Sequence, residues 1–84
     1  MGYLIEFRPA ARRALDELSA EDRSRISKAI DKLRVDPYGP GCKKLKGTDF
    51  WRTRAGDYRV VYTPFKTELV VVVIRIGHRR EVYR

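Results

Sequence analysis

The chain has 84 residues, a formal charge of +8 and an isoelectric point near 10.1. Its length suits a single domain over residues 1–84, and 43% hydrophobic residues exclude a disordered chain. The charge is uneven, because residues 1–36 hold 8 basic and 7 acidic side chains, whereas residues 37–84 hold 11 basic and 4 acidic. A basic half of this kind suits nucleic acid, although an acidic protein would also fit it.

Several classes of protein are disfavoured by what the sequence lacks. The single cysteine, Cys42, cannot form an intrachain disulfide and fits a reducing cytoplasm. One Cys and one His make no metal-ligand cluster, and no glycine-rich nucleotide loop is present. The longest apolar run, residues 69–74, is too short to span a membrane, and no signal peptide is evident. We therefore expect a cytoplasmic protein with no metal, no cofactor and no membrane attachment.

The first half of the chain predicts one strand followed by two helices. Residues 3–7 favour a strand, and Pro9 suits the first turn of a helix. Ser19 can cap a second helix, with Asp22 at the capping-box spacing. Both helices carry an apolar stripe at helical spacing, and their basic residues are predicted to face solvent. These basic residues are Arg12, Arg13, Arg23, Arg25, Lys28 and Lys32.

The second half predicts three strands joined by short connections. Prolines and glycines in residues 36–41 end the second helix, and residues 42–47 form a basic connection. Residues 51–62 read as a hairpin around a Gly56-Asp57 turn. Residues 68–76 have apolar side chains at both parities, so this strand should lie in the middle of the sheet and end at Gly77. The order β-α-α-β-β-β predicts an α+β fold, in which a helical hairpin packs on one face of a mainly antiparallel, twisted sheet.

The hairpin register predicts a cluster of arginines. A two-residue turn sets Arg54 opposite Arg59 and puts Arg52 on the same face, away from the helices. Two arginines directly opposite each other repel, so a chain that keeps them is expected to hold an anion there. Guanidinium groups bind phosphate in bidentate fashion. The preceding lysines, expected to contribute to RNA binding, are Lys43, Lys44 and Lys46.

The C-terminal segment could complete a site for RNA cleavage. His78 follows Gly77 and precedes Arg79 and Arg80, and a neutral imidazole can accept a proton. Tyr83 can stack on a base or donate a proton. RNA supplies its own nucleophile, the 2′-hydroxyl, so cations and one proton-transfer group would suffice without a metal. A surface tyrosine and an incidental histidine remain the plain alternatives.

These segments together resemble the RelE/ParE toxin superfamily, and within it the RelE-type mRNA interferases. The resemblance rests on residues 45–47, residues 54–62, the Val-rich last strand, and the 77–79 and 82–83 segments. It implies the β-α-α-β-β-β fold, a RelB-like antitoxin that wraps the toxin, and ribosome-dependent cleavage of mRNA in the A site. By position, Arg59 would contact the scissile phosphate, Arg79 would stabilise the transition state, and Tyr83 would stack on or activate the nucleotide.

One departure from the family bears on the mechanism. Arg52 and Arg54 stand where RelE-type enzymes often carry lysines, and arginine is a poor general base. Proton transfer would then fall to His78, the first choice, or to Tyr83. Two other functions remain open from the sequence: a ParE-like inhibitor of DNA gyrase and a non-catalytic nucleic-acid-binding module.

Overall fold

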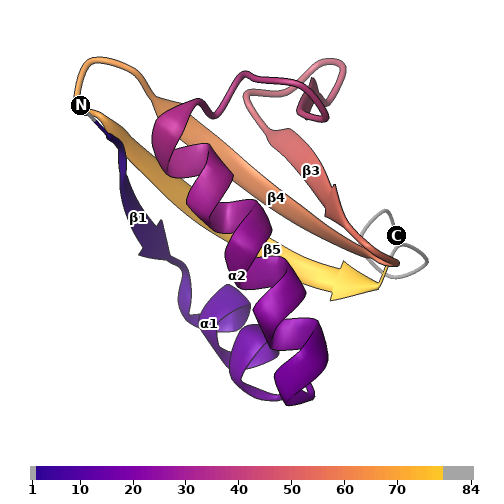
Figure 1. The fold of residues 1–84 in the computed structure, drawn as a ribbon. Coiled ribbons are helices and arrows are strands. Elements are labelled where there is room, and N and C mark those ends of the chain that lie inside the picture. The colour runs from indigo at the N-terminus through magenta and orange to yellow at the C-terminus, as the bar shows by residue number, and fades with distance from the viewer. Residues whose placement is uncertain (1, 79–84) are drawn as a thin grey trace.

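The computed structural model describes residues 2–78 and contains two helices and five strands (Figure 1). In chain order the elements are β1 (Leu4–Phe7), α1 (Pro9–Asp16), α2 (Ala20–Val35), β2 (Lys43–Lys44), β3 (Trp51–Ala55), β4 (Tyr58–Phe65) and β5 (Val70–His78). The predicted α+β class is confirmed. The one element that was not predicted is β2, which at two residues is too short to give a sequence pattern.

The helical hairpin forms where the sequence predicted it. Pro9 occupies the first turn of α1, where its missing N–H costs no helical hydrogen bond. Ser19 caps α2, and its Oγ accepts a hydrogen bond from the Asp22 backbone N–H at 3.2 Å. The side of α2 that meets the sheet buries Ile26, Ile30 and Leu33. Neither of the two described helices is long and apolar enough to cross a lipid bilayer.

The sheet has the strand order β1-β5-β4-β3-β2. The predicted antiparallel meander of β3, β4 and β5 is confirmed, and β5 is an interior strand that lies between β1 and β4. β1 pairs with β5 in parallel, because the helical hairpin carries the chain back across one face before the sheet resumes. One boundary was wrong: Gly77 does not end β5, since it pairs with Arg59 and the strand continues to His78.

The two faces of the sheet differ. Both helices lie on one face, where they cover the core (Figure 1). That core includes Val60, Tyr62, Val71 and Val73, all with 0% exposure. The opposite face has no helix over it among the described residues, and it presents the alternate side chains of the same strands.

Candidate nucleic-acid interface

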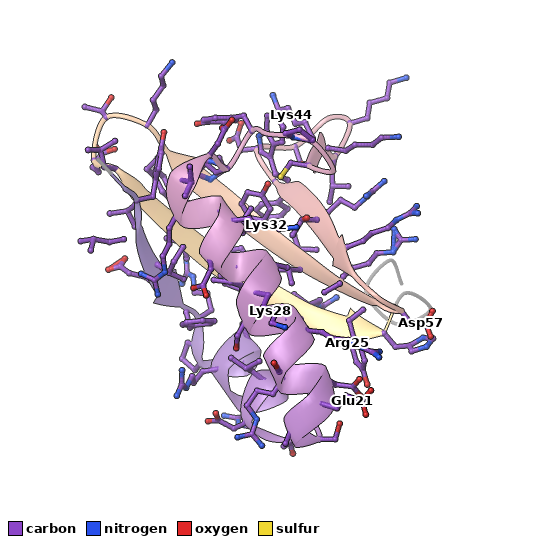
Figure 2. All side chains as sticks on the ribbon, viewed as in Figure 1. Glu21, Arg25, Lys28, Lys32, Lys44 and Asp57 are labelled. Carbon is purple, nitrogen blue, oxygen red and sulfur yellow. The ribbon has the colours of Figure 1, made fainter. Side chains whose placement is uncertain are left out.

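The β3–β4 hairpin has the predicted register. Arg54 pairs with Arg59, Arg52 pairs with Val61, and Gly56 begins the turn with a φ of +64°. A glycine with positive φ in the first central position is the requirement of a type II′ turn, whose twist matches that of the strands. Arg25 of α2 lies close to this turn, which carries Asp57 (Figure 2). The tip of the hairpin therefore lies next to the covering helix.

We define the arginine face as the side of the sheet away from the helices that carries Arg52, Arg54, Arg59 and Arg75. The first three were predicted there, and the register confirms that they share one side. Arg75 was missed, because the strand prediction treated its segment as a continuous apolar run. Its pairing with Val61, which pairs in turn with Arg52, puts it on the same face. A lone charge inside an otherwise apolar strand was the available signal.

The arginine face is strongly cationic. All the ion pairs found among the described residues lie within α1 and α2, so none joins Arg52, Arg54 or Arg75 to a carboxylate. In the five described strands Glu6 is the only acidic residue, and it lies on β1, across the sheet from β3. Guanidinium groups clustered on one sheet face can hold phosphate by charge and by bidentate hydrogen bonds.

The predicted lysines lie beside this face along the edge of the sheet. Lys43 pairs with Arg52 and so shares its side, whereas Lys44 pairs with Trp51 and takes the other parity. Lys46 is exposed in the loop that joins β2 to β3. At the edge of the sheet, a cavity of about 370 Å³ is lined by Lys32 of α2 together with Lys43, Arg52 and Arg54, among others.

Lys32 was expected only to cover a solvated helix side, and helical periodicity cannot reveal that it also borders this cavity. It follows Lys28 along α2, and Lys44 lies beyond the C-terminal end of the helix (Figure 2). Cations therefore continue from the edge strand onto the exposed side of the covering helix.

His78 does not stand beside the arginines as expected. It pairs with Tyr58, so its side chain lies on the helix side of the sheet, whereas Arg59 on the next residue of β4 points to the other side. The His78 and Tyr58 rings meet edge to face with centroids 5.9 Å apart. The Tyr58 hydroxyl donates to Asp22 Oδ2 at 3.2 Å. The physical reason is the register of β5, which could not be read from the sequence.

The other predicted site residues of the C-terminal segment are Arg79, Arg80 and Tyr83, and they lie outside the described residues. Their predicted roles stay predictions. The described residues also contain no group of three or more His, Cys, Asp and Glu side chains that could hold a metal ion.

A buried tyrosine fixes the loop that delivers β2 to the site. The Tyr62 hydroxyl donates to the Pro37 carbonyl oxygen at 2.6 Å, inside the core. Burial raises the pKa of the Tyr62 phenol far above its ordinary value, and a side-chain hydrogen bond with Cys42 raises it further. The Tyr38 ring packs edge to face on Trp51, with centroids 5.1 Å apart. The loop between α2 and β2 is thus attached to β3 and β4 at several points.

A family model for the ParE toxin of type II toxin-antitoxin systems, parDE, matches residues 5–83. The chain belongs to the RelE/ParE toxin superfamily. The toxin RelG of Mycobacterium tuberculosis is 31% identical over 88 residues, which cover 100% of this chain and 99% of RelG. The resemblance inferred from the hairpin and the C-terminal motifs is therefore confirmed.

Solved structures of the superfamily share the fold. A chain of the archaeal RelE–RelB complex from Pyrococcus horikoshii has a TM-score of 0.83 at 27% identity, covering 98% of this chain and 100% of its own length. The isolated Escherichia coli RelE toxin has a TM-score of 0.81 at 28% identity, covering 96% and 90%. This chain is a RelE-family toxin of a type II toxin–antitoxin system.

Proposed function

We propose that this toxin is a ribosome-dependent endoribonuclease that cleaves mRNA in the A site and so inhibits translation. The observation that carries the proposal is the pairing of Arg54 with Arg59 on a sheet face whose described strands hold a single carboxylate. Two arginines directly opposite each other repel, and an anion that lies between them makes the arrangement favourable. Arg59 is half-buried, whereas Arg54 is exposed. The surrounding residues therefore restrict the position of the Arg59 side chain more than that of a fully solvated side chain.

The proposed chemistry uses only groups of the RNA and of this chain. The RNA 2′-oxygen attacks the adjacent phosphorus, the bond from phosphorus to the 5′-oxygen breaks, and a 2′,3′-cyclic phosphate forms. The 2′-hydroxyl proton passes to a base, and the leaving 5′-oxygen takes up a proton. Arg59 and Arg79 are proposed to stabilise the negative charge that grows on the phosphoryl oxygens. Arg52, Arg54, the three lysines near β2, and Arg80 are proposed to bind the flanking RNA.

Proton transfer is proposed to fall to Tyr83. Arginine cannot serve, because it does not lose its proton at physiological pH. His78 was the first choice from the sequence, but its ring contacts Tyr58 on the helix side of the sheet, away from Arg59. A base must lie within hydrogen-bond distance of the proton that it abstracts, or reach it through one water. His78 lies on the side of the sheet opposite to Arg59 and so does not meet this requirement.

A RelB-like antitoxin is the proposed partner, besides a ribosome with mRNA in its A site. Several related structures are complexes of RelE with RelB, which supports this assignment. The arginine face would favour acidic side chains in the antitoxin segment that neutralises it. Bound in this way, the antitoxin would compete directly with the RNA phosphates.

The decisive experiment is a toeprint on translating ribosomes with the wild type and Arg59→Ala. The variant is expected to lose about 10²-fold or more in single-turnover cleavage rate, the usual effect of removing one group that stabilises transition-state charge. Arg13→Ala is the matched control, since it removes an exposed arginine from α1. Full cleavage by the Arg59→Ala variant would remove Arg59 from the site.

Two further variants in the same assay separate the candidates for proton transfer. Tyr83→Phe is expected to lower the cleavage rate by about 10²-fold or more, and His78→Gln to lower it much less. The reverse order would return the role to His78. A gyrase supercoiling assay run in parallel tests the ParE-like alternative: gyrase inhibition without mRNA cleavage would replace the proposal.

A further inference from the structure

The pairing of β4 with β5 contains an irregularity that determines where Arg75 points. Tyr62 pairs with Val73 and Val61 pairs with Arg75, so β5 advances two residues where β4 advances one. Ile74 is the extra residue, and the register shift is a β-bulge in β5. Bulges of this kind re-aim the side chains that follow them.

The effect of the bulge is visible in the burial along β5. Val71 and Val73 face the helices and are fully buried, so strict alternation would turn residue 75 into the core as well. After the bulge Ile76 lies in the core instead, with 5% exposure, and Arg75 is exposed on the arginine face. The bulge therefore keeps a guanidinium out of the core, where an unpaired charge would be costly.

The need to keep a polar side chain out of the core does not explain why residue 75 is an arginine, because any polar residue would meet that need. What distinguishes the position is its neighbours. Lys43, Arg52, Val61 and Arg75 are successive partners across four strands and form one row on the arginine face. Val61 is only 6% exposed, although it points away from the core, and the arginines on either side of it have stems long enough to cover it.

A second row runs parallel to the first. It consists of Arg54, Arg59 and Gly77, with no side chain on the last. The rows are two residues apart along the strands, or about 7 Å, and Arg52 and Arg75 are two strands apart, or about 10 Å. Adjacent phosphates of one extended RNA strand can therefore meet both rows at once.

We propose that Arg75, together with Arg52 and Lys43, binds the RNA phosphate next to the scissile one. This inference rests on the proposed function and gives the two rows different roles. The row with Arg59 acts on the reacting phosphate, and the row with Arg75 holds the neighbouring phosphate so that the scissile one is in register. Arg75 is thus a binding and positioning residue, and none of the reacting atoms needs to touch it.

The test compares Arg75→Gln with Arg13→Gln, which makes the same charge change at an exposed site on α1. The probe is a short, fluorescently labelled RNA with 2′-O-methyl groups, which can be bound but not cleaved. Its Kd is measured over a range of KCl concentrations. For one lost phosphate contact, Arg75→Gln is expected to bind about tenfold more weakly and to lower the slope of log Kd against log salt by about 0.7.

The cleavage assay provides an independent readout. On ribosomes, Arg75→Gln is expected to raise KM while the rate at saturation stays within about twofold of the wild type. The reason is that the phosphate contact is lost equally from the bound ground state and from the transition state. Arg75→Lys, which keeps the charge, is expected to restore the salt slope. Thermal unfolding of each variant separates loss of binding from loss of fold.

Failure of this inference differs from failure of the proposed function. If the wild type cleaves RNA but Arg75→Gln matches Arg13→Gln in Kd and in salt slope, the role of Arg75 is refuted and the endoribonuclease proposal stands. If Arg75→Gln instead lowers the saturated rate with an unchanged Kd, Arg75 acts on the transition state and the positioning role is refuted. If the wild type neither binds nor cleaves RNA, both proposals fall.

Discussion

The helix-covered face and the arginine face are formed by alternate residues of the same strands. On β4, Val60 and Tyr62 are completely buried under the helices, while Arg59 and Val61 point the other way. One face stabilises the fold by removing apolar surface from water, and the other concentrates like charges, which opposes folding. Because the backbone is shared, the buried face fixes the arginines in position. The difference teaches that stability and binding can be changed separately, through neighbouring residues on one strand.

The largest expected effect comes from breaking the covered face. Ile26 is fully buried in α2, so Ile26→Ala should lower the free energy of unfolding by about 2–5 kcal/mol, through lost burial and the cavity left behind. Urea denaturation measures this change. Val35→Ala on the same helix is the control. Because Val35 is 79% exposed, this substitution should change the free energy of unfolding by no more than about 0.5 kcal/mol. Equal losses in the two variants would contradict the assignment of the core.

A smaller effect is expected at the hydrogen bond between Tyr62 and Pro37. Tyr62→Phe keeps the ring but leaves the Pro37 carbonyl without its donor, which should cost about 1–3 kcal/mol in the free energy of unfolding. Tyr58→Phe, whose hydroxyl bonds Asp22 in a half-buried position, should cost less. Urea midpoints of the two variants compare the sites directly, and a greater loss at Tyr58 would contradict the ranking.

The same tyrosine gives a pH dependence with a definite sign. Its folded-state pKa is raised by burial, so its contribution to stability is complete below the unfolded-state pKa of about 10. As pH rises above about 10, the unfolded chain loses the Tyr62 proton while the folded protein keeps it, and the free energy of unfolding falls. The Tyr62→Phe variant should lose less stability over this alkaline range, and an identical slope in both proteins would count against the burial of the phenol.

The local features of both faces were predictable from the sequence. The Gly56-Asp57 turn sets a two-residue hairpin, and from that turn alone the pairing of Arg54 with Arg59 follows. The helical spacing of the apolar residues and the Ser19 cap likewise predicted the two helices that cover the core. These predictions succeeded because each depends on residues that are close together in the chain.

The features that were missed depend on contacts between distant segments. Which side chains of β5 share a face with those of β4 cannot be counted through the 66–69 connection, in which Leu69 takes a positive φ. The bulge at Ile74 then reverses the alternation of side chains along β5. Arg75 was missed because its segment was read as a continuous apolar run, and the bulge determines the side of the sheet on which Arg75 and His78 lie. The bulge changes which side chains of β5 face the helices, and it puts Ile76 in the core.

The smallest expected effect, that of Arg54→Gln, separates the two faces of the sheet best, because stability should rise while RNA binding falls. Arg54 is exposed and sits directly opposite Arg59, so Arg54→Gln should raise the free energy of unfolding by about 0.2–1 kcal/mol by removing the like-charge contact. The same substitution should weaken binding of the uncleavable RNA. Added salt should narrow the stability difference between the variant and the wild type, since screening weakens the repulsion in the wild type. A variant that loses both stability and binding would show that Arg54 supports the fold, and the view of the arginine face as strained in the free protein would then fail.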